Sequence, residues 1–287
     1  MALKVGIQLF SVRDMMQEDP KATIKKVADL GYKYIEPANH HALEDDGVGF
    51  RVSAEELNKI LEESGSRVVS NHIFPFTDEN IDGIIAYNKA IGNKYLVFPV
   101  RYYKSKEDVL ELCEILNRFG KKCKEEGLML LYHNHYQEFQ KFDGKTVMDY
   151  IVELTDPEAV GLEIDTFWTM RGGVDPVDAI HHFGDRIKLL HQKDYQPVEG
   201  EPANLFEKWG YDMDLTSSEK FKASYSHDGF TEVGCGTMDI QNIINAANEI
   251  GSVEYIILEQ DFTKRDQLES VVMSMDSFKK YDGISWD

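Results

Sequence analysis

The chain has 287 residues, 42% of them hydrophobic and 29% charged, as in ordinary soluble globular proteins. Its 51 acidic and 31 basic residues give a net charge of −20, which argues against a nucleic-acid partner because phosphate binding needs a basic surface. No apolar run approaches the roughly 20 residues of a membrane span, and no signal-peptide pattern is present. Three cysteines without metal or redox spacing argue against a disulfide framework. These features predict a cytoplasmic protein.

Short apolar runs with strand character recur along the whole chain. The predicted strands are Lys4–Leu9, Tyr34–Glu36, Arg67–Ser70, Tyr95–Val100, Met129–His133, Val160–Asp165, Ile187–His191 and Tyr255–Glu259. Between them lie amphipathic segments with helix starts and stops. The predicted helices are Pro20–Leu30, one from Ser53 to Gly65, Asp78–Ile91, Lys106–Glu126, one near Thr146–Leu154, one from about Pro176, Asp239–Ile250 and one from about Arg265.

This alternation of buried strands and helices is typical of a parallel sheet. About eight such units in one chain of this length predict an α/β fold, a closed (β/α)₈ TIM barrel over residues 1–287 as a single domain. A doubly wound sheet is the second choice, because the first strand is not followed by a G-x-G-x-x-G turn. The long polar and aromatic segment 194–232 is interpreted as an elaborated loop or lid after strand seven.

Polar residues collect at the predicted strand ends, which in a barrel face the active site. They are Gln8, Glu36, His72, His133, His135, Glu138, Glu163, Asp165, His191, Lys193, Glu259 and Gln260. A single acid or histidine at such a place is usually a helix cap or is satisfied by the backbone. Asp165, His191 and Glu259 follow three consecutive strands, and burying carboxylates together is costly without a neutralising cation. This set therefore predicts a site for Mn²⁺, Co²⁺ or Zn²⁺.

Other notable residues carry less weight. His181 and His182 fall late in a helix, and His40 and His41 fall in a polar loop. Cys235 is interpreted as a turn residue. The turn 234–237 could bind phosphate, but starting the next helix is the preferred interpretation.

Several motifs together resemble the xylose isomerase-like TIM barrels of the sugar phosphate isomerase/epimerase superfamily. The segments that carry the resemblance are Gly6–Asp14, Tyr132–Phe139, Leu162–Trp168, Leu190–Asp194, Phe230–Asp239 and Leu258–Asp261. The resemblance implies a divalent metal, commonly manganese with Co²⁺, Zn²⁺ or Mg²⁺ as alternatives, held by carboxylates from strands five, six and eight and a histidine from strand seven. Asp165, His191 and Glu259 match the last three positions.

The strand-five position departs from the epimerase pattern. Where that branch has a glutamate, this chain has His133, and the nearest carboxylate is Glu138. Either residue could be the fourth ligand, and Glu138 is slightly favoured because it preserves a shell of three carboxylates and one histidine. A symmetric two-glutamate epimerisation is therefore less secure.

The resulting hypothesis is an isomerase or epimerase that removes an α-proton from a keto sugar or related polyol through a metal-stabilised enediolate. His135 is the preferred base and His133 the next, since imidazole titrates near neutral pH. Glu259 is assigned as ligand and second acid/base, and Lys193 as a group that binds a substrate oxygen or neutralises the oxyanion. Expected substrate contacts come from strand ends and one aromatic side chain. These are Gln8, Glu36, His72, Glu163 and Trp168.

Three alternatives are kept. The first is a dehydratase or lyase acting on an inosose or a 3-keto-glycoside. The second is an apurinic endonuclease, which the negative charge disfavours. The third is a non-catalytic sugar-binding barrel, which the intact ligand set disfavours. The predicted partner is a small-molecule carbohydrate, and self-association is left open.

Overall fold

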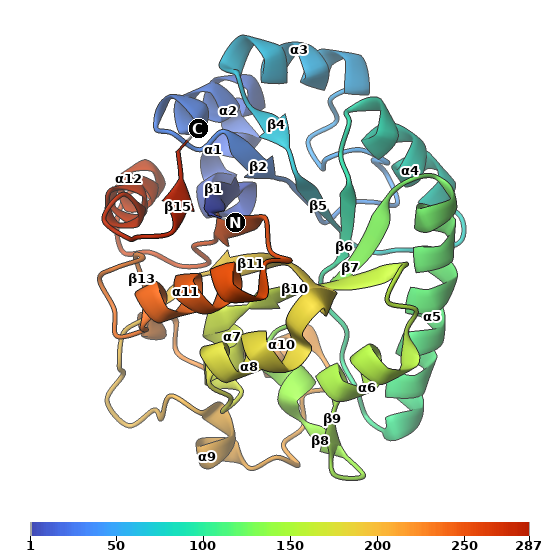
Figure 1. The fold of residues 1–287 in the computed structure, drawn as a ribbon, viewed down its shortest axis with the longest axis vertical. Coiled ribbons are helices and arrows are strands. Elements are labelled where there is room, and N and C mark those ends of the chain that lie inside the picture. Colours follow the sequence, from blue (N-terminus) through green and yellow to red (C-terminus); the bar gives the residue numbers. More distant parts are fainter. Residues whose placement is uncertain (1, 287) are drawn as a thin grey trace.

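The computed structural model describes residues 2–286, and its centre is a ring of parallel strands (Figure 1). The strands of the ring, in chain order, are β1 (Leu3–Gln8), β2 (Tyr34–Glu36) with β3 (Ala38–Asn39), β4 (Arg67–Val68) with β5 (Ser70–Ile73), β6 (Tyr95–Phe98), β7 (Met129–His133), β10 (Val160–Asp165), β11 (Ile187–Gln192) and β14 (Tyr255–Leu258). The hydrogen-bonded order is β3-β5-β6-β7-β10-β11-β14-β1-β2-β4.

Two of the eight strands are each interrupted by one residue, and the pairing between these two strands closes the ring. Pro37 separates β2 from β3, and Val69 separates β4 from β5. β2 pairs with β4, and β3 pairs with β5. The strand order therefore begins and ends with halves of the same two strands, which makes the sheet a closed ring. The predicted TIM barrel is confirmed. The third strand extends to Ile73, beyond its predicted end at Ser70, so His72 lies within the strand.

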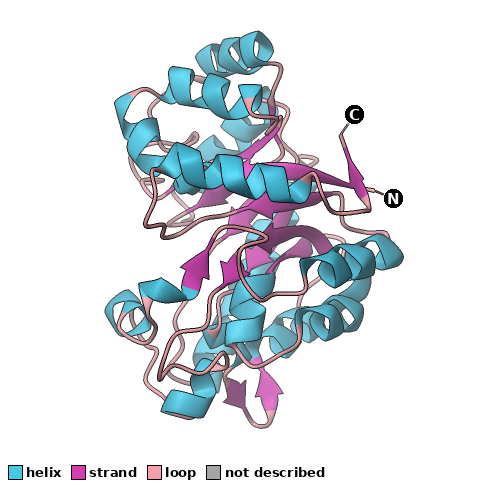
Figure 2. Ribbon diagram, turned by 90° about the vertical axis from the view of Figure 1, so that its left-hand side faces the viewer, coloured by secondary structure: helices cyan, strands magenta, loops and turns pink. Residues whose placement is uncertain are grey.

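Helices surround the ring (Figure 2). They are α1 (Arg13–Glu18), α2 (Pro20–Asp29), α3 (Ala54–Ser64), α4 (Ile81–Ala90), α5 (Lys106–Glu125), α6 (Val147–Leu154), α7 (Thr166–Arg171), α8 (Pro176–Phe183), α11 (Ile240–Ile250) and α12 (Gln267–Phe278). Local chemistry sets their ends: the Ser53 hydroxyl accepts from the Glu56 amide at 3.2 Å, and Gly65 ends α3 in the left-handed conformation. Among the described helices none is both long and apolar enough to cross a membrane.

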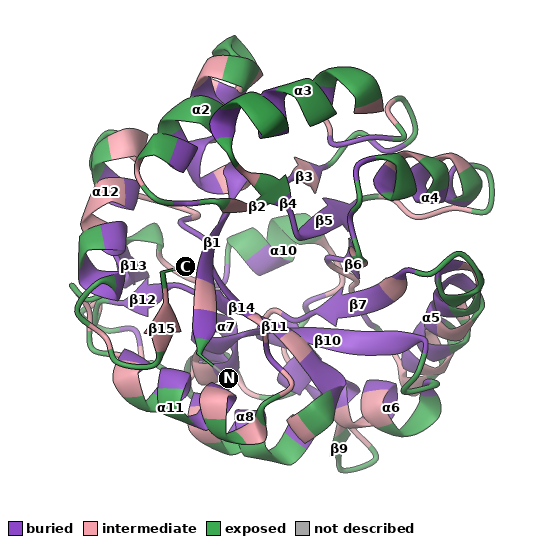
Figure 3. Cartoon of the chain, turned by 45° about the horizontal axis from the view of Figure 1, so that its top comes forward, coloured by how far each residue is buried: buried purple, intermediate pink, exposed green. Residues whose placement is uncertain are grey.

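Burial follows this arrangement (Figure 3). Every residue of β10 is buried, because the strand packs against side chains on both faces, while the helices expose their outer faces. The segment after β11 adds the hairpin β12 (Asp194–Tyr195) and β13 (Phe230–Thr231) and the short helices α9 (Leu205–Trp209) and α10 (Ser218–Lys222). A second small hairpin, β8 (Lys141–Phe142) with β9 (Lys145–Thr146), precedes α6, and β15 (Ile284–Ser285) pairs with β1.

Candidate active site

Four ligand-type side chains meet at the carboxyl ends of β7, β10, β11 and β14. His133, Asp165, His191 and Glu259 each offer one donor atom, and these atoms all lie within 4.8 Å of one another. All four side chains are buried. We call them the four-donor cluster. It contains the three predicted ligands Asp165, His191 and Glu259 together with His133.

Both histidines of the cluster are oriented by deeper carboxylates. His191 directs Nε2 to Glu36 Oε1 at 2.6 Å, and its Nδ1 lies 3.0 Å from Glu259 Oε2. His133 directs Nδ1 to Glu163 Oε2 at 3.1 Å, and its Nε2 lies 4.0 Å from Asp165 Oδ2. Each ring thus points one N–H at a deeper carboxylate and turns its other nitrogen toward the cluster. Histidines that bind metals are usually held in this way.

A second polar layer lies beneath the cluster. Gln8 donates to Glu36 at 2.8 Å, and His72 Nε2 lies 2.6 Å from Glu163 Oε2. Burial opposes a charge on His72, but Glu36 and Glu163 more than reverse this and raise its pKa to about 10. The sequence predicted substrate contacts for Gln8, Glu36, His72 and Glu163. Only His72 lines the cavity; the other three have no exposed surface and lie behind the histidines.

Lys193 brings a positive charge to the cluster. Its ammonium contacts Asp165 Oδ2 and Glu259 Oε2 and lies 3.6 Å from Asp261 Oδ2. Burial acts against this charge, yet the surrounding carboxylates raise the pKa of Lys193 well above its usual value. Two buried oxygens of the deeper layer, Glu36 Oε2 and Glu163 Oε1, have no hydrogen-bond partner in residues 2–286. The donor set and its excess of acceptors therefore fit a divalent cation.

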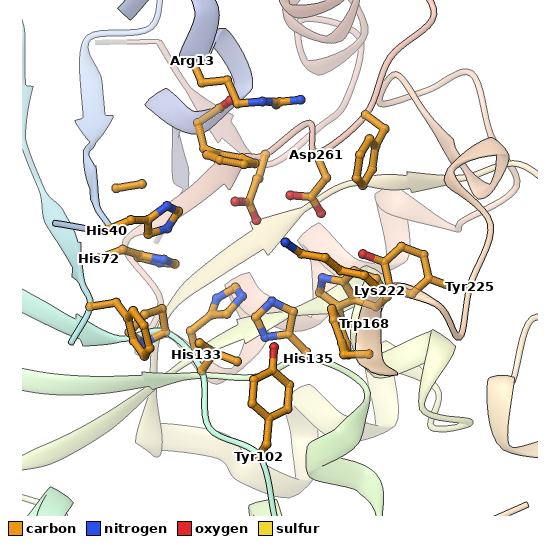
Figure 4. A pocket seen from close by; sticks show the side chains of 18 residues that line it. Arg13, His40, His72, Tyr102, His133, His135, Trp168, Lys222, Tyr225 and Asp261 are labelled. Carbon is orange, nitrogen blue, oxygen red and sulfur yellow. The ribbon is translucent and has the colours of Figure 1, made fainter. Parts of the chain in front are cut away.

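A cavity of about 530 Å³ opens above the cluster (Figure 4). His133, His135, Trp168 and Glu259 line it, as the sequence predicted for an active site. The lining also includes residues that the sequence did not single out: Arg13, Tyr102, Asp261, Phe221, Lys222 and Tyr225. Asp261 and Arg13 could have been found, since each follows closely on the end of a strand. The others lie on connecting segments whose path no local pattern reveals.

His135 is placed as a neutral imidazole in this cavity. Burial, helped by the charge of Lys193, lowers the pKa of His135 to about 3, and its buried Nδ1 has no partner among the described residues. Its ring lies 5.6 Å from Trp168 and 5.3 Å from Phe221, measured between ring centroids. These rings confine the imidazole. Its lowered pKa keeps it neutral, so it does not titrate near neutral pH as the sequence hypothesis assumed.

Glu138, the favoured fourth ligand, is not brought to the cluster. The short turn Gln137–Phe139 directs it away, and it is fully buried. Its Oε1 accepts from the hydroxyls of Tyr132 at 2.7 Å and Tyr103 at 3.2 Å, and its Oε2 accepts from the His135 amide at 2.8 Å. The structure therefore brings His133, and not Glu138, to the three predicted ligands, and Glu138 is a brace for the backbone of His135.

This brace predicts a pH-dependent stability. Burial raises the pKa of Glu138 from 4.5 to about 7, partly offset by the hydrogen bonds from Tyr132 and the His135 amide. The folded chain thus keeps a proton that the unfolded chain has lost, so its stability falls as pH rises through this window, by up to about 3 kcal/mol. Glu138→Gln should remove this part of the slope in urea unfolding at several pH values. The exposed Glu249→Gln is the control, and an unchanged slope in Glu138→Gln would contradict the assignment.

Asp194 occupies the turn considered for phosphate. Its carboxylate accepts from the amides of Gly234 and Gly236 at 2.9 Å and of Met238 at 3.1 Å. Those amides are therefore satisfied within the chain, which supports the preferred interpretation that the turn organises the start of α11.

The segment 194–232 covers one side of the cavity and is anchored to the barrel. Arg171, on α7, forms a buried ion pair with Glu201, and Gln140 donates to the Met213 carbonyl at 3.0 Å. The Tyr136 hydroxyl also contacts the Ser224 hydroxyl. These contacts hold Phe221 and Tyr225 against the cavity.

Breaking the Arg171–Glu201 ion pair should loosen the contact of segment 194–232 with the barrel. Arg171→Met leaves Glu201 buried without its partner, and we expect the free energy of unfolding to fall by about 3 kcal/mol, measured by urea denaturation. Limited proteolysis should then cut within residues 194–232. Lys220→Ala breaks an exposed ion pair with Asp214 in the same segment and should cost less than about 1 kcal/mol. Equal losses in the two variants would show that the buried pair has no special role.

Comparison with known families adds to this geometry. A family model described as "Xylose isomerase-like TIM barrel" matches residues 24–281. The chain belongs to the xylose isomerase-like TIM barrel family. The family predicted from the motifs is thereby confirmed, and the prediction of an enzyme is supported.

Relatives of this xylose isomerase-like barrel carry different activities. A protein named inosose dehydratase from Mesomycoplasma hyopneumoniae is 27% identical, over 92% of this chain and 88% of the other. A solved sugar phosphate isomerase/epimerase from Parabacteroides distasonis has a TM-score of 0.75 at 23% identity, covering 99% of this chain and 96% of the other. The IolI protein, solved with a zinc atom, has a TM-score of 0.67 at 16% identity, covering 97% and 96%. At these identities the two structures show the fold alone.

Proposed function

We propose that this barrel is a divalent-metal-dependent dehydratase that removes the α-proton of a cyclic keto-polyol, such as an inosose, or of a keto sugar and then eliminates water. One observation carries the proposal. His135, a neutral imidazole that is not one of the four donors, lines the cavity beside the four-donor cluster, and the ammonium of Lys193 is held at the same cluster. The activity named for the Mesomycoplasma relative supports the same outcome.

His133, Asp165, His191 and Glu259 would hold the metal. Their two nitrogen and two carboxylate donors suit Mn²⁺, with Co²⁺, Zn²⁺ and Mg²⁺ as alternatives, and a protein of the same fold, IolI, was solved with a zinc atom. When bound, the cation supplies Lewis acidity to the carbonyl oxygen of the substrate and its adjacent hydroxyl.

The chain's own residues account for the proton movements. His135 accepts the proton from the α-carbon, and the C–H electron pair shifts toward the carbonyl oxygen. Lys193 donates a hydrogen bond to that oxygen as it gains negative charge. The imidazolium of His135 then returns its proton to the β-hydroxyl group, which leaves as water while the carbon–carbon double bond forms. One base on one face is sufficient for this sequence.

Epimerisation or isomerisation is the second candidate. Epimerisation needs a second acid/base, and Glu259 lines the cavity, as the sequence hypothesis required. However, Glu259 Oε2 lies 3.0 Å from His191 Nδ1 and also contacts Lys193, so that oxygen is already engaged. This favours elimination.

Incubation in D₂O separates the two outcomes. The manganese-loaded protein would be offered an inosose, keto sugars and 3-keto-glycosides, and the products analysed by mass spectrometry and NMR. Dehydration gives a product lighter by one water. Epimerisation or isomerisation gives an isomer that carries solvent deuterium, and this result would replace the proposed reaction with the second candidate. Release of neither product from any substrate would contradict both.

A further inference from the structure

The active-site cavity adjoins a second one. This outer cavity, of about 430 Å³, shares Phe10, Arg13, Ala38 and His40 with the inner cavity. It lies between the start of α1 and the loop that follows β3. Because Arg13 lines both cavities, a substrate whose ring lies above the four-donor cluster can place a substituent beside Arg13, at the border of the outer cavity.

The outer cavity has an unusual charge for this chain. Its lining includes Arg13, Arg51, His40 and His41 and no aspartate or glutamate, although acids outnumber bases 51 to 31 in the sequence. Hydroxyl groups of a neutral sugar need acceptors as well as donors, whereas guanidinium groups only donate. A wall rich in donors and free of carboxylates matches a substituent that only accepts, which is an anion.

Arg13 is the residue best placed to bind that anion. Its guanidinium carbon lies 4.5 Å from the centroid of the Phe10 ring, and Nη1 donates to the Phe10 carbonyl at 3.1 Å. In the part of the chain that the structure describes, no carboxylate lies within ion-pair distance of it. The group is therefore held in place with donors to spare, a geometry that suits carboxylate or phosphate.

The other charged groups nearby are already engaged. Asp261, which lines the inner cavity together with Arg13, lies 3.6 Å from the Lys193 ammonium. Arg51 is exposed and pairs with Glu44 at 2.9 Å. The Asp45 carboxylate accepts from the amides of Gly47 at 2.8 Å and Arg51 at 2.9 Å, so it is committed to the loop. Arg13 thus dominates the part of the cavity that joins the two volumes.

We propose that the outer cavity is a binding subsite for an anionic substituent, a carboxylate or a phosphate, on the keto-polyol or keto sugar that reacts in the inner cavity. The inference rests on the proposed function for the identity of the inner ring. It makes Arg13 a specificity-determining residue that contacts the substrate away from the reacting atoms.

Binding without turnover tests this subsite. Isothermal titration would compare D-glucuronate, D-glucose 6-phosphate and D-glucose on the full chain. We expect at least one anion to bind about tenfold more tightly than glucose, because one charge-assisted contact contributes roughly this much. Preference for glucuronate or for the phosphate identifies the natural anion. Equal affinity for all three probes would overturn the proposal.

Variants assign the effect to Arg13. Arg13→Gln should abolish the preference for the anion and leave glucose binding within about twofold, and Arg13→Lys should restore part of the preference. Arg118→Gln, on the exposed face of α5, is the matched control and should behave like the unaltered chain. An anion preference that survives in Arg13→Gln would overturn the subsite. Since no reaction is measured, failure of the proposed dehydration would leave these results unaffected.

Discussion

Replacing His135 with alanine is expected to lower turnover by about 10²–10⁴-fold while the protein keeps its metal. The imidazole lines the cavity but is not one of the donors of the four-donor cluster. Its removal therefore deletes the proton acceptor and leaves His133, Asp165, His191 and Glu259 intact. Turnover would be measured on the substrate found in D₂O, and bound metal by mass spectrometry of the purified variant.

The control for this change is another histidine. His182 lies on the exposed side of α8 and pairs with Asp149, so His182→Ala should leave both turnover and metal content unchanged. Unaltered turnover in His135→Ala would remove the residue from the mechanism. Loss of the metal together with activity would instead assign it to the ion, and solvent deuterium exchange into the substrate by His135→Ala would point to another base.

The barrel could be predicted because its determinants are local. Runs such as Val160–Asp165 are apolar enough to be buried on both faces, and Gly65 and the Ser53 cap mark where α3 ends and begins. The interruptions at Pro37 and Val69 were not predicted. They depend on how two neighbouring strands share hydrogen bonds, and no single stretch of sequence contains that information.

The site was predicted where strand direction alone decides it. Asp165, His191 and Glu259 converge because parallel strands end at the same edge of the ring. The direction of Glu138 depends on the turn Gln137–Phe139 and on two distant tyrosine hydroxyls, which a strand-end argument does not include. The sequence also does not reveal how deep in the barrel a side chain lies. Glu36 and Glu163 have the expected strand-end positions, but their side chains lie beneath His191 and His133.

Metal affinity should separate His133 from Glu138. In His133→Ala we expect the affinity for Mn²⁺ to fall by more than about 100-fold, because a donor is lost from the four-donor cluster. In Glu138→Gln we expect affinity to stay within about twofold, since both carboxylate oxygens are bonded to Tyr132, Tyr103 and the His135 amide. Titration of the metal-free variants with Mn²⁺, followed by calorimetry, gives both constants.

Turnover, measured beside metal affinity, distinguishes a residue that binds the metal from Glu138, which holds the backbone of His135. Glu138→Gln should still lower turnover, because the carboxylate that fixes the His135 amide is changed while the ion is retained. Glu163→Gln alters the carboxylate that orients His133 Nδ1. It should lower the affinity for Mn²⁺ by about 10–100-fold, which lies between the losses expected for Glu138→Gln and His133→Ala. The reverse order, with Glu138→Gln losing the metal and His133→Ala keeping it, would require the turn at Gln137–Phe139 to open and return Glu138 to the cluster. The order of the three affinities therefore decides which residue of the His-Asn-His-x-x-Glu motif holds the ion and which holds the base.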